Sequence, residues 1–166
     1  MSRPLRSVLR TLAAVSASAV VVNYPWEMLQ SPLYTMDPSS ASLWWHCFVA
    51  SLGDAVLVLI LLGAGWALRR RLEWFERPLV KDSVALIGAG ALLGIGVEWL
   101  GVHVLGRWGY QPEMPRVPEL EVGLVPVVQM ALLPPLVFRL AAAWLRRARA
   151  FPRRAGRGSR DKEPDR

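Results

Sequence analysis

Two carboxylic acids and a histidine interrupt apolar stretches of this 166-residue chain, and they are its best candidates for chemistry. Asp54 and Glu98 each lie inside a long run of apolar residues, and His46 precedes Asp54 by eight positions. A carboxyl group in an apolar site can act as a general acid near neutral pH. Asp54 or Glu98 could therefore protonate an alkene, with His46 as the proton acceptor.

A second set of polar and aromatic side chains could hold a ligand beside these acids. Asn23 and Glu27 are four residues apart and so share one face of a helix. The face of a tryptophan ring attracts positive charge, so Trp99 could face a cationic or polyene ligand. The residues predicted to bind a ligand are Glu27, Asn23, Trp99, His103, Tyr110 and Gln129.

Four apolar segments carry these residues. Crossing a bilayer core takes roughly 20 apolar helical residues, and each segment is that long. The segments mostly lack the polar face of a soluble helix. The sequence therefore predicts an all-α integral membrane four-helix bundle over residues 1–150, followed by a disordered basic tail at 151–166. The predicted spans are about 7–28, 43–68, 83–105 and 122–145.

The first segment also has features of a secretory signal peptide. A basic start (Arg3, Arg6 and Arg10) precedes an apolar run, and Ala17-Ser18-Ala19 fits a small-residue cleavage site. The apolar run continues beyond that site through residues 20–22. We therefore expect an uncleaved membrane helix.

The distribution of charge predicts the orientation of the bundle. The chain has 20 Lys+Arg against 13 Asp+Glu, a formal net charge of +7. The basic residues gather before the first span, between the second and third, and after the fourth. The positive-inside rule then predicts that both termini and the connection between the second and third spans lie in the cytoplasm. The excess charge thus reports topology and argues against nucleic acid as a partner, although the tail could bind anionic lipid.

Tryptophan and glycine positions add detail to this bundle. The 8 tryptophans lie near the ends of the predicted spans, which is typical of interfacial aromatic belts. On the third span, Gly90, Gly94, Glu98 and Gly101 recur on one helix face. Small residues let helices approach closely, so we expect Glu98 on the packed side. Prolines 126, 134 and 135 could bend the fourth span beside Gln129.

All four predicted spans carry polar residues at a similar depth in the membrane. Several functions are consistent with such a polar cluster. An intramembrane enzyme could act on a lipid or isoprenoid by acid–base chemistry. The chain could instead be an accessory or assembly subunit of a membrane complex, or a small protein that binds a hydrophobic ligand, with its polar groups holding the bundle together. It could also form a homo- or hetero-oligomer. Metal binding would need ligands assembled in three dimensions, because no metal-binding spacing exists. A transporter would need to oligomerise, because no internal repeat is visible. The residues specify no cofactor.

The polar motifs together resemble a group of small four-helix bacterial inner-membrane proteins. The resemblance spans residues 20–136 and implies the fold and the membrane location, but no activity. The chain departs from that pattern at Val125 and Met130, to which we assign no role. A looser likeness to the emopamil-binding sterol isomerases is analogy only. The motifs that carry the resemblance are Asn23-Tyr24-Pro25-Trp26-Glu27, Gln30, Pro32-Leu33-Tyr34, His46-Cys47, Gly53-Asp54, Glu98-Trp99, Trp108-Gly109-Tyr110, Met114-Pro115, Gly123-Leu124, Gln129 and Leu133-Pro134.

Overall fold

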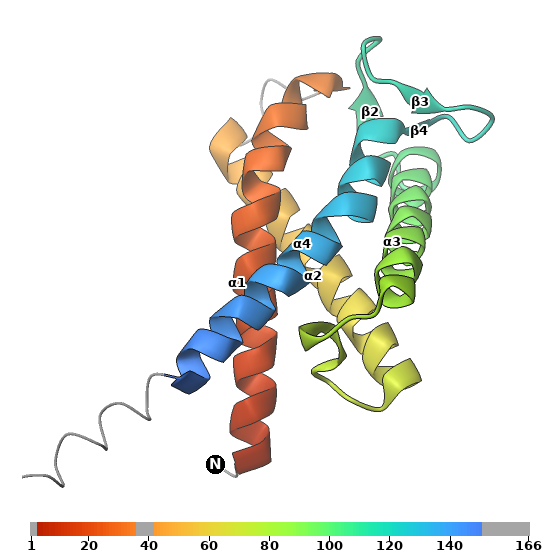
Figure 1. The fold of residues 1–166 in the computed structure, drawn as a ribbon. Coiled ribbons are helices and arrows are strands. Elements are labelled where there is room, and N and C mark those ends of the chain that lie inside the picture. The colour runs from red at the N-terminus through yellow and green to blue at the C-terminus, as the bar shows by residue number, and fades with distance from the viewer. Residues whose placement is uncertain (1–2, 36–41, 151–166) are drawn as a thin grey trace, which may run out of the picture.

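Four long helices build most of the protein (Figure 1). The structure, a computed structural model, describes residues 3–35 and 42–150, so the predicted tail at 151–166 lies outside the described residues. The helices are α1 (Arg3–Gln30), α2 (Leu43–Arg69), α3 (Val80–Trp99) and α4 (Leu124–Ala150). Each is long and apolar enough to cross a membrane, which confirms the four predicted segments. The short elements are η1 (Ser31–Leu33), β1 (Tyr34–Thr35), η2 (Trp74–Glu76), η3 (Leu100–Val104), β2 (Gly109–Tyr110), β3 (Arg116–Val117) and β4 (Val122–Gly123).

The helices alternate in direction, so the connections gather at two ends (Figure 1). The strand end carries β1 to β4. The opposite end, called the basic end below, carries the start of α1, the connection from α2 to α3 and the last turns of α4. α1 packs against both α2 and α4, and α4 packs against α3, whereas α2 and α3 contact each other little. The bundle is therefore closed on three sides and loosely joined on the fourth.

A helix of unusual geometry follows α3. The sequence predicts one helix to residue 105, but the structure changes at Leu100 to a π-helix, η3, in which the amide of Leu105 bonds to the carbonyl of Leu100 at 2.9 Å. π-Helical turns are rare in proteins, and those that occur are often found at functional sites. Here the π-helix directly follows Glu98 and Trp99.

Two small antiparallel pairings cover the strand end. β1 pairs with β2, setting Tyr34 opposite Tyr110, and their rings lie 5.7 Å apart. β3 pairs with β4 just before α4 begins. The β1–β2 pairing ties the segment after α1 to the segment after α3.

Apolar packing dominates the half of the bundle toward the basic end. Buried side chains of α1, α2 and α4, such as Val15, Val58 and Val137, form one core cluster with Phe75 of η2. The sequence predicts an interfacial position for Trp74, but its ring packs against Phe138 at 5.3 Å and its indole N–H donates to the carbonyl of Leu62.

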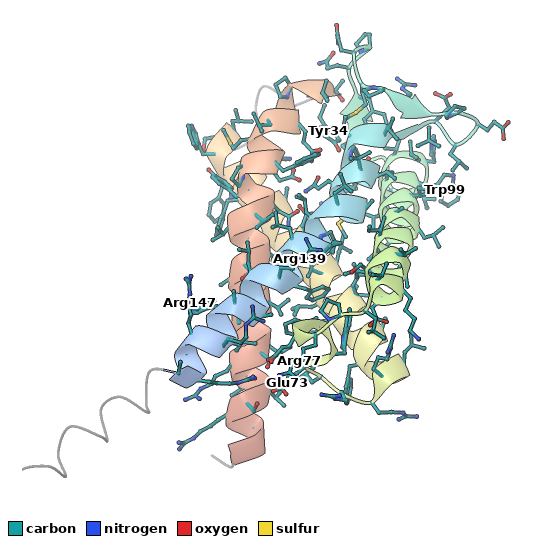
Figure 2. All side chains as sticks on the ribbon, in the orientation of Figure 1. Tyr34, Glu73, Arg77, Trp99, Arg139 and Arg147 are labelled. Carbon is teal, nitrogen blue, oxygen red and sulfur yellow. The ribbon has the colours of Figure 1, made fainter. Side chains whose placement is uncertain are left out.

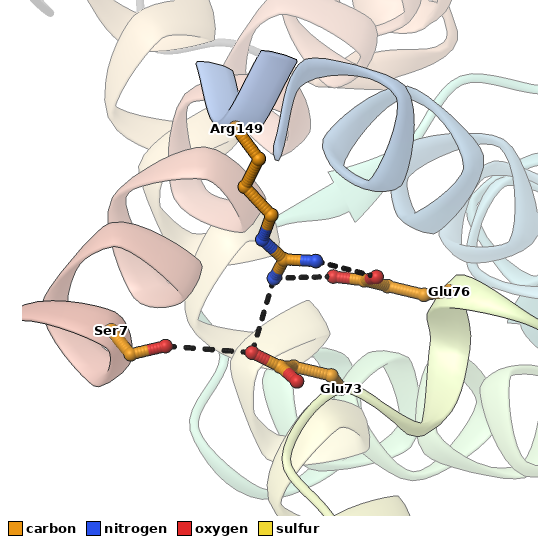
Figure 3. A network of polar contacts seen from close by, with 4 residues as sticks. All are labelled: Ser7, Glu73, Glu76 and Arg149. Atoms are coloured by element: carbon orange, nitrogen blue, oxygen red, sulfur yellow. Dashed lines mark hydrogen bonds and ion pairs between the residues drawn. The ribbon is translucent and has the colours of Figure 1, made fainter. Parts of the chain in front are cut away.

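Ionic contacts close the basic end. The guanidinium of Arg149 donates to both carboxylate oxygens of Glu76 at 2.9 Å and to Glu73 at 3.1 Å (Figure 3). Glu73 also accepts from the hydroxyl of Ser7 on α1 at 3.4 Å. Arg69 and Asp82 form a further ion pair. These contacts join α4, α1 and the α2–α3 connection.

Close approach of α3 to α4 depends on glycine. A Cβ on Gly90 would collide with the main-chain carbonyl of Met130, and a Cβ on Gly94 would lie 3.0 Å from the Met130 side chain. Glu98 is buried one turn further along the same face, as expected. The glycine face of α3 therefore fixes where Glu98 lies.

Gly90→Ala should destabilise the bundle because α3 would have to move away from the α4 backbone. Overpacking of this kind costs roughly 1–3 kcal/mol. Gly88→Ala on the same helix is the matched control, because a Cβ there meets no atom of the described residues within 4 Å. Thermal unfolding in detergent, followed by circular dichroism, measures both. Equal effects of the two substitutions would contradict this packing.

Candidate functional site

The side-chain amide of Gln129 on α4 joins three helices. Its nitrogen, Nε2, lies 2.9 Å from the side-chain oxygen of Asn23, 2.8 Å from Glu27 and 2.8 Å from Asp54. Asn23 and Glu27 are on α1, and Asp54 is on α2. An amide nitrogen carries two protons, so three acceptors compete for two hydrogen bonds. We call these four side chains and Gln30 the Gln129 cluster.

Gln30 completes the Gln129 cluster from the last residue of α1. Its amide nitrogen donates to Gln129 at 2.8 Å and to Glu27 at 2.7 Å, while its oxygen accepts from the indole of Trp26 at 3.0 Å. Asn23 in turn donates to the carbonyl of Ala19 at 2.9 Å. Each amide orientation is therefore set by its neighbours.

A second polar group lies across the bundle on α3. One carboxylate oxygen of Glu98, Oε2, accepts from the hydroxyl of Tyr110 at 2.5 Å and from the indole of Trp108 at 3.3 Å. Gly101 makes room for the Trp108 ring, because a Cβ there would overlap it. The π-helix and β2 thus bring two hydrogen-bond donors back onto the acid that precedes them.

A cavity of about 440 Å³ separates the two polar groups. That volume is within the range of small-molecule sites. Acids from three helices line it, together with aromatic, small and apolar side chains. The lining residues are Glu27, Gln30, Ser31, Tyr34, Thr35, His46, Cys47, Ala50, Gly53, Asp54, Leu57, Gly94, Val97, Glu98, Arg107, Trp108, Pro126, Gln129 and Met130.

The structure brings most of the predicted site residues to this cavity. Glu27, Asp54, Glu98 and Gln129 line it, and the exposed His46 lies at its rim. Asn23 and Tyr110 contact lining residues without lining the cavity themselves.

Two predicted ligand-binding residues lie elsewhere. Trp99 is 48% exposed on the outer side of α3, with its ring 6.2 Å from that of His103 (Figure 2). A ring nitrogen of His103 lies 3.1 Å from the carbonyl of Leu120. Neither lines the cavity. Trp99 directly follows Glu98 on α3, so the turn of the helix that brings Glu98 inward directs Trp99 outward.

Sequence reasoning missed Gln30, Trp108 and Arg107 as residues of this site. Gln30 follows Glu27 by three positions, so the helix face shared by Asn23 and Glu27 could have revealed it. The position of Trp108 in the sequence predicts an interfacial belt, and nothing in its spacing predicts the contact with Glu98. Arg107 lies in a connecting segment, where periodicity carries no signal.

The strand end supplies two tyrosines with altered acidity. Burial raises the pKa of Tyr110 above its ordinary value, and the hydrogen bond to Glu98 raises it further. Burial likewise raises the pKa of Tyr34, which lies at the strand end (Figure 2), and the charge of Glu98 adds to this effect. Both phenols therefore stay protonated, and Tyr110 remains a donor to Glu98.

The acids do not form a metal site among the described residues. No three side chains of His, Cys, Asp or Glu gather there in a way that could hold a metal ion. Glu27 and Asp54 instead satisfy part of their hydrogen-bonding capacity with amides. Hydrogen bonding and proton transfer are the chemistry that this arrangement offers.

Comparison with protein-family models, with curated proteins and with solved structures finds no match to this chain. The resemblance to small bacterial membrane proteins stays a prediction. Function is therefore inferred from the side chains around the cavity.

Gln129→Leu should destabilise the bundle because it removes up to three hydrogen bonds, two that the amide nitrogen donates to α1 and α2 and one that the amide oxygen accepts from Gln30. At about 0.6 kcal/mol per bond within a membrane, the loss is roughly 2 kcal/mol. Gln111→Leu, the same change in a connecting segment, is the control. Unfolding in detergent measures both, and an equal response would show that the Gln129 cluster contributes no net stability.

The raised tyrosine pKa values predict a loss of stability at alkaline pH. The folded state keeps these protons while the unfolded state releases them near pH 10, so the free energy of unfolding falls as pH rises above 10. In this pH range, phenolate absorbance should be lower in the folded protein than in the unfolded protein. Tyr34→Phe and Tyr110→Phe should each remove one late-titrating phenol. Full ionisation of the folded protein near pH 10 would contradict the burial of both phenols.

Proposed function

We propose that this chain is a multi-pass inner-membrane protein that binds a lipid or isoprenoid in the cavity and exchanges a proton with it. The observation that carries the proposal is the cavity itself, because acids from three separate helices line it within a bundle of four apolar helices. Ionisable groups inside a membrane are costly and mark functional sites by default.

Charge supports the orientation in which both termini are cytoplasmic. Among the described residues, Arg107 and Arg116 are the basic side chains of the connections at the strand end, whereas the α2–α3 connection alone holds three arginines. By the positive-inside rule, the basic end faces the cytoplasm. Gln129 is five residues from the start of α4, which puts the cavity about 8 Å below the outer end of that helix.

Because α2 and α3 contact each other little, a ligand in the membrane could enter the cavity between these two helices. Ala50, Asp54 and Leu57 of α2 and Val97 of α3 line the cavity, while the two helices pack little against each other. A ligand with an apolar tail could move from the bilayer between these helices without crossing water. Its polar part would then meet the acids.

The acids are arranged for proton exchange. Glu27 and Asp54 lie at the same amide nitrogen, and two carboxyl groups that share a site repel when both are ionised. Such a pair is suited to hold and release one proton. In an alkene isomerisation, Asp54 or Glu98 would give its proton to one carbon of the double bond, which leaves a cation on the other carbon. His46 or the carboxylate so formed would then accept a proton from the next carbon along, and the C–H electron pair would form the shifted double bond. His46 at the rim would connect the acids to water.

A second candidate function rests on the direct hydrogen bonds of the Gln129 cluster. These bonds join α1, α2 and α4 without any ligand, which is what a purely structural role requires. The chain would then be an accessory or assembly subunit of a membrane complex. Copurification in mild detergent distinguishes the two functions, since a stable protein partner favours the accessory role and a bound lipid favours the cavity.

Asp54→Asn and Glu98→Gln test the enzymatic proposal. Loss of a general acid or base lowers turnover by about 10²–10⁴-fold, so each variant should change the lipid or pigment profile of a host that depends on the chain. Glu113→Gln, an exposed acid outside the cavity, is the matched control. Unchanged profiles in both cavity variants, with normal membrane insertion, would exclude proton transfer to a lipid.

A further inference from the structure

The cavity offers a ligand carboxyl oxygens to which no described residue donates. Glu98 is only 6% exposed, and its Oε2 takes both available hydrogen bonds, while no described residue donates to Oε1. Asp54 likewise accepts through Oδ2, with no described donor on Oδ1. Among the described residues, the one fully buried side-chain atom without a partner is the hydroxyl oxygen of Thr11. The free oxygens of Glu98 and Asp54 are therefore accessible, and the accessible space beside them is the cavity.

The donors that contact these acids directly are already engaged, although Tyr34, Thr35, His46 and Arg107 also bring donor groups to the lining. The protons of Gln129 and Gln30 point to oxygens of the Gln129 cluster, and those of Trp108 and Tyr110 point to Glu98. A ligand must therefore bring its own donors to the free carboxyl oxygens.

Charge and aromatic rings favour a cationic donor. Three acids line the cavity, and Arg107 is the only Lys or Arg side chain among the lining residues. Arg107 is exposed and so lies at the mouth. Trp108 and Tyr34 supply aromatic walls, and aromatic rings attract ammonium groups. An ammonium head would thus combine hydrogen bonds, opposite charge and aromatic contact.

We infer that the cavity selects amphiphiles with a protonated amine head over neutral or anionic amphiphiles with the same tail. This inference rests on the proposed function, because it names the ligand class of the same cavity. The head lies between Asp54 and Glu98, and the tail leaves between α2 and α3 along Leu57 and Val97. An ammonium head donates up to three hydrogen bonds, which suits carboxyl oxygens on two helices.

Radiolabelled dodecylamine, which is protonated at neutral pH as a lysine side chain is, tests the inference. The full chain is placed in phosphatidylcholine nanodiscs, and retention of the probe is measured against empty discs. Unlabelled dodecanol and dodecyl sulfate serve as competitors with the same tail. We expect saturable binding of dodecylamine that neither competitor displaces at equal concentration.

Variants separate the role of the acids from general damage to the fold. Glu98→Gln keeps an oxygen for Tyr110 and Trp108 but removes the charge, and it should weaken dodecylamine binding by about ten- to a hundredfold. Asp54→Asn should act in the same direction. Arg107→Gln should strengthen binding, by up to about fivefold, because it removes a like charge at the mouth. Glu113→Gln should leave binding unchanged.

Each contrary outcome has a distinct meaning. Equal binding of dodecanol, or weaker amine binding in Arg107→Gln, would overturn the inference of a cationic head. Displacement by dodecyl sulfate together with loss of binding in Arg107→Gln would show an anion site at the mouth instead. If dodecanol or an isoprenoid alcohol binds through the acids and the amine does not, the inference fails while the proposed function stands. If no probe binds and no lipid copurifies, both fail.

Discussion

The arrangement of this bundle depends on one amide group, the side chain of Gln129. A buried polar group costs free energy unless it is hydrogen-bonded, and an apolar bundle offers few partners. Gln129 is 2% exposed, and it meets this requirement through side chains from two other helices. Each partner is itself polar and confined to the same depth. The positions of α1, α2 and α4 relative to each other are therefore set together near the strand end.

The third helix is held by different forces, and this difference creates the cavity. α3 lies against α4 through Gly90 and Gly94, where main-chain approach replaces side-chain hydrogen bonding. Its acid, Glu98, bonds to Trp108 and Tyr110 of the chain that follows, and to no residue of the Gln129 cluster. Neither the glycine packing nor the hydrogen bonds of Glu98 connect α3 to α2, so the space between these two helices stays open. Two separate polar groups on opposite walls follow directly from this construction.

The sequence predicts the helices well and the site in part. Apolar runs bounded by charge identify all four helices, because the length needed to cross a bilayer leaves little choice. Helical spacing correctly puts Glu98 on the glycine face. The position of Trp108 depends on the π-helix and on β2, and neither has a periodic signal. Trp99 is wrongly predicted to line the site because it adjoins Glu98 in sequence. Neighbouring residues on a helix point in different directions, so Trp99 points away from the side that Glu98 occupies.

A hydrogen-bond network and a binding cavity at first look like competing explanations of the same acids. The geometry shows that they are compatible, because a carboxyl group has two oxygens and the network occupies mainly one. In Glu98 both donors among the described residues converge on Oε2, which fixes the side chain and leaves Oε1 without a described donor. In Asp54 the same division holds, with Gln129 on Oδ2. The hydrogen bonds that position these acids also leave each with a second oxygen, so the structural role of the contacts and the proposed binding role are compatible.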